Sequence, residues 1–176
     1  MMTIFTLLLS VLLPISETNS NLIEWEESRK LSWSDFQGAP DPNSTNAALT
    51  NTSINAEFGF NKKELTYSIR CRFNKSKSWV RVKSDYILAH EQAHFDITEI
   101  FARKLHKALK EYRFNERTVG EDVNRIYESI MKGQHAFQIQ YDAETDHSRI
   151  PAKQKEWETK IAGLLKEYSG FKNYAQ

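Results

Sequence analysis

The sequence contains a single cysteine, Cys71, among 176 residues. One cysteine excludes an intrachain disulfide, so the fold cannot be a small domain held together by disulfides. Net charge is also scarce, because 24 Lys and Arg residues balance 23 Asp and Glu residues. The formal net charge of +1 gives no general attraction to nucleic acid or to acidic membranes. A composition of 40% hydrophobic and 27% charged residues is ordinary for a globular protein with a real core.

The first twenty residues are expected to be a signal peptide. Residues 4–15 form an almost continuous apolar run, and residues 16–21 are small and polar. A run of about a dozen residues is short for a membrane-spanning helix, which needs about 20, but it suits a secretory signal that is cut before Asn21. No Lys or Arg precedes the run, so an uncleaved membrane anchor is the alternative. No cysteine follows the run closely, which gives no support to a lipid-modified N-terminus.

Residues 21–176 are then expected to form one domain that is secreted or periplasmic. They contain no repeat, linker or low-complexity tract. Export without disulfides is more typical of a bacterial cell envelope than of a small eukaryotic secreted domain. We expect no stable membrane insertion after signal cleavage and no nucleic-acid partner. The sequence predicts nothing about the oligomeric state.

Alternating apolar residues predict strands in the first half of the chain. We expect a short extended segment at 30–33, a loop at 34–43, strands at 50–60 and 65–73 joined by a turn at 61–63, and a further strand at 78–82. The alternation is strictest at 65–73, and it places Cys71 on the apolar face as a buried thiol. Together these segments predict a small antiparallel meander.

From Ser84 onward the apolar period becomes helical. A long helix is expected at 84–112, followed by a connection at 113–117. Thr118 and Glu121 have the spacing of a capping box that opens a second helix, and Pro151 opens a third helix. Two long helices with a short connection pack as an antiparallel hairpin. The predicted fold is therefore α+β, with a small N-terminal antiparallel β-sheet packed on a long helical hairpin plus a C-terminal helix.

The first of these helices carries the motif His90-Glu91-Gln92-Ala93-His94. Two histidines four positions apart lie on one helix face, about one turn from each other, so both imidazoles can bind one metal ion. Glu91 lies roughly 100° further round the helix, where it can hold a metal-bound water instead of the metal. This arrangement is typical of zinc hydrolases. The alternative is that both histidines are ordinary core or surface residues.

A catalytic zinc ion needs a third protein ligand. If the hairpin turns near residue 115 or 116, His90 lies level with Tyr141 on the second helix and His94 with Phe137. Segment 138–147 is therefore expected to supply the ligand. Its candidates are His147, which zinc chemistry favours, then Asp142, either as ligand or as an acceptor that fixes one histidine, and finally Glu144 and Asp146.

Two further roles follow from such a site. Zinc lowers the pKa of its bound water toward about 7, and Glu91 can take the proton and deliver it to the leaving amine. Tyr141 can donate a hydrogen bond to the oxyanion, although a core tyrosine is the alternative. His106 and His135 lie level with neither histidine of the motif, and we expect them to be structural or surface residues.

Several separated strings resemble one bacterial family. They are LSWSDFQG at 31–38 with Ala47 and Ala48, SWV at 78–80, LAHEQAHFDI at 88–97, ARKL at 102–105, YDAETDH at 141–147 and QKEW at 154–157. In this order they are similar to the domain of unknown function 922, whose members are described as secreted zinc-dependent proteases. The resemblance implies a peptidase with a zincin-like fold, and it supplies no substrate.

The sequence as a whole predicts a secreted zinc-dependent peptidase. It would hydrolyse peptide or protein substrates with a Zn²⁺-bound water that Glu91 activates. Among enzymes, the alternative is a zinc amidase that acts on cell-wall peptide linkages. From another class, the alternative is a non-enzymatic envelope binding protein with a structural or vestigial zinc site. Glu91 argues against this last alternative, because a structural site has no use for a base.

Overall fold

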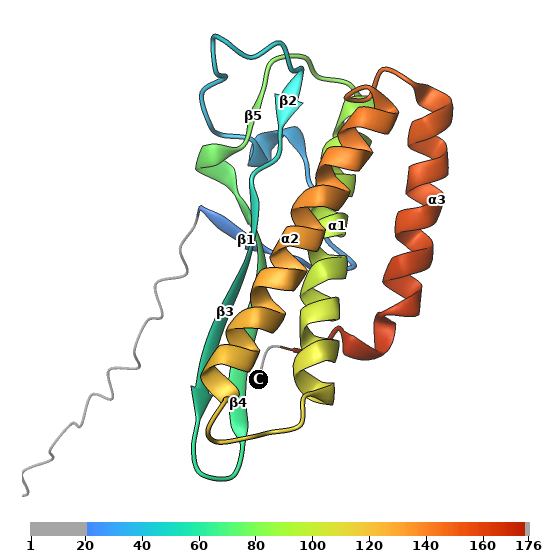
Figure 1. Ribbon diagram of the computed structural model, residues 1–176. Coiled ribbons are helices and arrows are strands. Elements are labelled where there is room, and N and C mark those ends of the chain that lie inside the picture. Colours follow the sequence, from blue (N-terminus) through green and yellow to red (C-terminus); the bar gives the residue numbers. More distant parts are fainter. Residues whose placement is uncertain (1–20, 175–176) are drawn as a thin grey trace, which may run out of the picture.

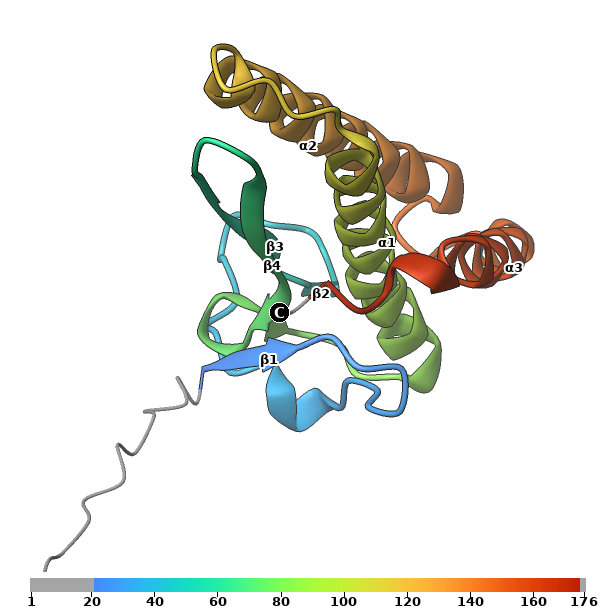
Figure 2. The same ribbon diagram turned by 90° about the horizontal axis from the view of Figure 1, so that it is seen from below.

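The computed structural model describes residues 21–174, so the expected signal peptide at 1–20 lies outside the described residues. The fold is α+β, as predicted, with a small antiparallel sheet at the N-terminal side and three helices (Figure 1). Helix α1 (Asp85–Glu111) lies at the centre, with the sheet on one side and α3 (Pro151–Glu167) on the other, and α2 (Val119–Thr145) packs along it (Figure 2). None of the described helices is long and apolar enough to cross a membrane.

The sheet is built on the hairpin of β3 (Thr52–Phe60) and β4 (Leu65–Asn74), the two strands that alternation predicts most clearly. Their pairing runs from Thr52 opposite Phe73 to Phe60 opposite Leu65. One face of β4 is buried through Ile69, Cys71 and Phe73, so the prediction of a buried thiol is confirmed. This face packs on α1, which supplies the motif.

The extended segment expected at 30–33 does not become a paired strand. The first strand is β1 (Leu22–Glu24), which pairs with β4, whereas residues after 30 lead into a short 3₁₀ helix, η1 (Trp33–Asp35). The Asp35 carboxylate accepts hydrogen bonds from the backbone N–H and the hydroxyl of Ser32 and pairs with Arg29 at 3.0 Å. Such local side-chain bonds compete with strand pairing, which explains the difference.

The strand expected at 78–82 does not continue the meander. It is reduced to β5 (Trp79–Val80), which pairs with β2 (Ala48–Leu49) in a separate sheet, so the main sheet has the order β1-β4-β3. A 3₁₀ turn, η2 (Lys75–Lys77), redirects the chain after β4, and the Asn74 side chain caps it by accepting a hydrogen bond from the Lys77 N–H. The local cap again overrides the alternating pattern.

Helices α1 and α2 form the predicted antiparallel hairpin. Ser84 caps α1, because its hydroxyl accepts a hydrogen bond from the Ile87 N–H at 3.1 Å. The capping box predicted at Thr118 and Glu121 does not form. Thr118 precedes α2, but its hydroxyl donates to the Asp122 carboxylate at 2.7 Å and makes no cap with the helix backbone.

A buried polar network joins α1 to both ends of the described chain. Arg103 Nε donates to Glu99 Oε1 at 2.8 Å, and the two side chains are only 3% and 1% exposed. The Arg103 guanidinium also donates to the Leu165 carbonyl of α3 and lies over the Trp25 ring. Tyr174 donates its hydroxyl proton to the other Glu99 oxygen. Burial raises the pKa of Glu99, and hydrogen bonds from Tyr174 and Arg103 oppose that rise.

Candidate metal centre

The His-Glu-x-x-His motif lies near the start of α1, on the side that faces α2. His90 and Glu91 are buried, with 3% and 4% of their surfaces exposed. The Nε2 atoms of His90 and His94 are 3.2 Å apart, and the two rings meet edge to face at 88°. Both imidazoles therefore direct a nitrogen at the same point.

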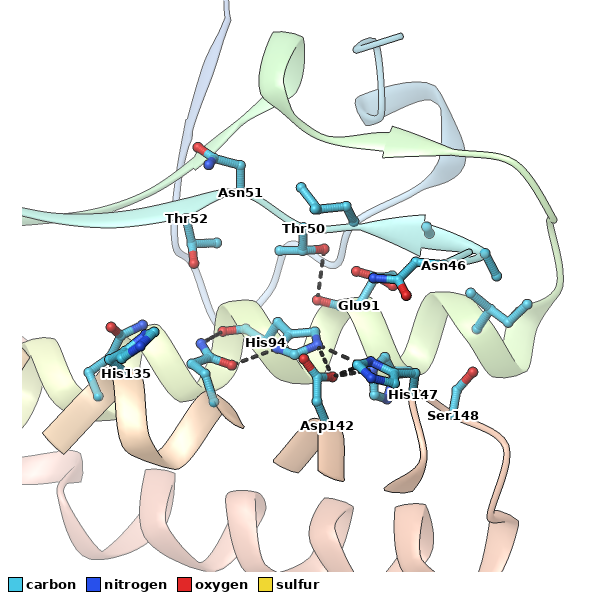
Figure 3. A pocket seen from close by; sticks show the side chains of 17 residues that line it. Asn46, Thr50, Asn51, Thr52, Glu91, His94, His135, Asp142, His147 and Ser148 are labelled. Carbon is cyan, nitrogen blue, oxygen red and sulfur yellow. Dashed lines mark hydrogen bonds and ion pairs between the residues drawn. The ribbon is translucent and has the colours of Figure 1, made fainter. Parts of the chain in front are cut away.

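Asp142, from α2, completes this group. Its Oδ1 atom lies 3.2 Å from His90 Nε2 and 3.1 Å from His94 Nε2. Within residues 21–174, these three side chains form the one cluster of histidine, cysteine and acidic groups close enough to hold a metal ion, with all ligand atoms within 4.8 Å of one another. Asp142 points up from α2 toward His94 in Figure 3.

The spacing of the three atoms fits zinc. With zinc–ligand bonds of about 2.0–2.2 Å, two ligands of a tetrahedral ion lie about 3.3–3.5 Å apart. The three separations in this group, 3.1–3.2 Å, are close to that distance between two ligands. Two imidazoles and one carboxylate are also a usual ligand set of catalytic zinc. Beside them, Glu91 Oε2 is buried and has no hydrogen-bond partner among the described residues.

His147 lies beside the group of three but is not part of it, whereas the sequence favoured it over Asp142 as the third ligand. Its Nδ1 atom lies 3.6 Å from Asp142 Oδ1, and 44% of its side chain is exposed. The chain leaves α2 through three successive residues with positive φ, namely Asp146 (47°), His147 (50°) and Ser148 (73°). This left-handed turn folds back onto α2, where the His147 N–H donates to the Asp142 carbonyl, and it leaves the His147 imidazole at the rim.

The other two acidic candidates face away from the histidines. Glu144 Oε2 accepts a hydrogen bond from Trp157 Nε1 of α3 at 2.8 Å. Asp146 pairs with Arg149 at 3.3 Å on the surface. Neither carboxylate therefore belongs to the metal group.

Tyr141 occupies the position of a core tyrosine, so its predicted role as oxyanion donor does not fit. Its ring is fully buried and stacks on His90 with centroids 4.6 Å apart. Its hydroxyl lies 3.4 Å from the His90 carbonyl oxygen. Tyr141 is level with His90, as the hairpin register predicts, but it lies behind the histidine and does not line the cavity in front.

The metal group lies in a cavity of about 280 Å³ between β2, α1 and α2 (Figure 3). Residues 46–52 form one continuous wall, and the Thr50 hydroxyl donates to the Glu91 carbonyl at 3.3 Å. His135 is an exposed residue on the α2 wall, as Figure 3 shows, and it does not join the metal group. His106 is buried elsewhere, with Nδ1 2.9 Å from the Phe171 carbonyl, so its predicted structural role fits.

A family model described as "Bacterial protein of unknown function (DUF922)" matches residues 26–148. This range covers more than half of the chain and includes both motif histidines and Asp142. The chain belongs to the DUF922 family. No curated protein and no solved structure matches it. The family resemblance is therefore confirmed, while peptidase activity and a zincin-like fold stay predictions.

The charges in this DUF922 site suit a metal ligand set. Burial raises the pKa of Asp142, but hydrogen bonds to His90 and His94 outweigh it and hold that pKa well below its usual range. Burial, with the charge of His94 beside it, lowers the pKa of His90 and outweighs the hydrogen bond to Asp142, which raises it. At His94 burial also lowers the pKa, but the hydrogen bonds to Asp142 and Gln138 and the charges of Asp142 and Glu91 together outweigh burial, so the pKa is raised. Asp142 is thus ionised, as a metal ligand must be.

One residue of the site, Gln138, was not among the candidate residues, although it begins the segment 138–147 that was expected to supply the third ligand. Its Oε1 lies 2.6 Å from His94 Nδ1, and its Nε2 donates to the His94 carbonyl at 2.9 Å. The hairpin register predicts Phe137 level with His94, and Gln138 is the next residue. An amide does not itself stand out as a zinc ligand, however, and its role depends on contacts that only the packed helices create.

Proposed function

We propose that this protein is a zinc-dependent peptidase. The observation that supports it is the convergence of His90 Nε2, His94 Nε2 and Asp142 Oδ1, within 3.1–3.2 Å of one another, at a cavity that Glu91 also lines. Three protein ligands are typical of catalytic zinc, whereas structural zinc sites use four. The cavity gives a substrate access to the group.

His90, His94 and Asp142 would hold the zinc ion. When bound, zinc acts as a Lewis acid that polarises a carbonyl and makes a water molecule acidic near pH 7. Glu91 is the base. Glu91 lines the cavity and directly follows the ligand His90 in the helix. One of its carboxylate oxygens has no partner among the described residues, so Glu91 can take a proton from water and pass it to the leaving amine.

We propose that His147, and not Tyr141, is the hydrogen-bond donor to the oxyanion. Its imidazole is 44% exposed and borders the cavity, so it can donate a hydrogen bond to a bound carbonyl oxygen. The Tyr141 hydroxyl is buried behind His90 and cannot reach such a group. We also propose export to the cell envelope or the medium, which rests on the apolar run at 4–15.

The test is hydrolysis of a mixture of unstructured peptides by zinc-loaded protein, with new chain ends identified by mass spectrometry. The wild-type protein should cleave, chelation should stop cleavage, and added zinc should restore it. Glu91→Gln is the matched control, because it keeps the shape of the side chain and removes the base. Zinc binding without any hydrolysis would favour the envelope binding protein, and cleavage confined to cell-wall peptides would favour the amidase.

A further inference from the structure

We infer that Gln138 is a positioning residue that fixes the tautomer and the orientation of His94. The inference rests on the proposed zinc site and adds a residue that binds neither metal nor substrate. Gln138 lies on α2 one turn before Asp142, so one face of this helix supplies both a ligand and the partner of another ligand.

The contacts of Gln138 determine which way its amide points. Its Nε2 lies 2.9 Å from the His94 carbonyl oxygen, which can only accept a hydrogen bond, and 3.3 Å from the Thr98 hydroxyl. The NH₂ group must therefore face the His94 carbonyl oxygen of α1. The opposite end of the amide, Oε1, then faces His94 Nδ1 at 2.6 Å. Because a carbonyl oxygen only accepts, Nδ1 must carry the proton.

This proton position is the one that zinc binding requires. If His94 held a metal ion through Nε2, Nδ1 would be the one ring nitrogen left to carry a proton. Gln138 accepts that proton, which holds the ring with Nε2 directed at Asp142 Oδ1, 3.1 Å away, and at His90 Nε2, 3.2 Å away. An outer partner, meaning a group that accepts a hydrogen bond from the ring nitrogen that does not bind the metal, orients a histidine ligand and raises its basicity.

Gln138 is itself held in place from the sheet. The Thr98 hydroxyl, which Gln138 contacts, donates to the His94 carbonyl at 3.0 Å and lies 2.7 Å from the hydroxyl of Thr52 in β3. A chain of hydrogen bonds thus runs from β3 through α1 to the amide. The orientation of His94 depends on all three elements.

Among the described residues, His90 has no such partner. Its Nδ1 atom is buried and makes no hydrogen bond to any described residue, and the ring is instead stacked on Tyr141. The two histidine ligands are therefore held differently, one by a hydrogen bond and one by packing. Loss of the Gln138 amide should therefore disturb the orientation of the His94 ring and leave that of His90 unchanged.

Zinc affinity of the full protein tests the inference directly, measured by competition with a chromophoric chelator. Gln138→Leu should weaken zinc binding by about ten- to a hundredfold, the usual effect of losing an outer partner. Gln138→Glu restores an acceptor for the Nδ1 proton and should recover most of the loss. Gln134→Leu is the control, because Gln134 also contacts Thr98 and lines the cavity but makes no hydrogen bond to His94.

A spectroscopic signature separates positioning from general loss of structure. In zinc-loaded protein with ¹⁵N-labelled histidine, His94 should show an Nδ1–H proton that exchanges slowly with water, and Gln138→Leu should abolish that protection while circular dichroism stays unchanged. Wild-type zinc affinity and an unchanged Nδ1–H signal in Gln138→Leu would overturn the inference, as would failure of Gln138→Glu to recover affinity. Neither readout uses a substrate, so absence of hydrolysis alone would contradict only the proposed function.

Discussion

His90 Nε2 lies 3.2 Å from Asp142 Oδ1, although the two residues are 52 positions apart in the chain. They meet because α1 and α2 form an antiparallel hairpin with a short connection, so the first turns of α1 lie beside the last turns of α2. The same register places Gln138 against His94. Changes on α2 should therefore affect metal binding as strongly as changes in the motif itself.

Asp142 and His147 are expected to differ sharply in their effect on zinc affinity. Asp142→Ala removes a ligand and should weaken zinc binding by more than about a hundredfold. Loss of an outer partner of a ligand weakens metal binding by about ten- to a hundredfold, and loss of the ligand itself should cost more. His147→Ala should change affinity less than tenfold and should lower kcat, because the imidazole lies at the cavity rim. Competition titration and steady-state kinetics measure the two effects. The reverse order of zinc affinities would return His147 to the ligand set.

Glu91→Gln should separate metal binding from catalysis. The amide keeps the volume of the side chain but cannot take a proton, so kcat should fall by at least about 10²–10⁴, the usual contribution of a general base. Zinc affinity should stay close to that of the wild type, since Glu91 is not a member of the ligand group. Zinc-loaded variant and wild type are compared on the same peptide. Undiminished cleavage would remove Glu91 from the mechanism.

The buried pair of Arg103 and Glu99 should matter far more to stability than a surface pair on the same helix. Arg103→Ala leaves the Glu99 carboxylate buried without its charged partner and should cost about 3–5 kcal/mol. Lys107 and Glu111 lie 3.9 Å apart with 42% and 63% of their side chains exposed, and Lys107→Ala should cost less than about 0.5 kcal/mol. Urea unfolding gives both values. Similar losses would show that burial of the pair is unimportant.

Alanine at two glycines should have opposite effects on stability. A Cβ atom at Gly38 would lie 2.7 Å from the Ser76 carbonyl oxygen and 2.9 Å from that of Ser78, so Gly38→Ala should destabilise the fold by about 1–3 kcal/mol. A Cβ atom at Gly163, in the exposed middle of α3, meets no atom of the described residues within 4 Å. Gly163→Ala should therefore stabilise by about 0.5–1 kcal/mol. Thermal unfolding decides the signs, and a stabilising Gly38→Ala would contradict the described packing.

The sequence predicted those parts of the fold in which a long apolar period is the dominant signal. The hairpin of β3 and β4 and the three helices are of this kind, because each buries a regular stripe of side chains. The extended segment at 30–33 forms no paired strand and the capping box at Thr118 does not form, for one physical reason. The Asp35 carboxylate accepts a hydrogen bond from the Ser32 backbone N–H, which strand pairing would have used. The Asp122 carboxylate likewise accepts one from the Thr118 hydroxyl, which the capping box would have used.

The candidate site was predictable only to within one turn of helix. The hairpin register predicts Tyr141 beside His90, and the structure brings Asp142, the next residue, to both histidines. Which of two neighbouring residues faces the cavity depends on how α2 is rotated about its axis, and the chain length between the helices does not fix that rotation. His147 could not be placed either, since three successive non-glycine residues with positive φ give no pattern in a sequence.

The ligand set of His90, His94 and Asp142 is tested most directly by zinc content. Purified protein reconstituted with zinc and freed of excess metal should hold close to one zinc ion per chain, and the His94→Ala and Asp142→Ala proteins, folded by circular dichroism, should hold little under the same conditions. A wild-type protein without zinc, or variants that retain as much zinc as the wild type, would contradict the account.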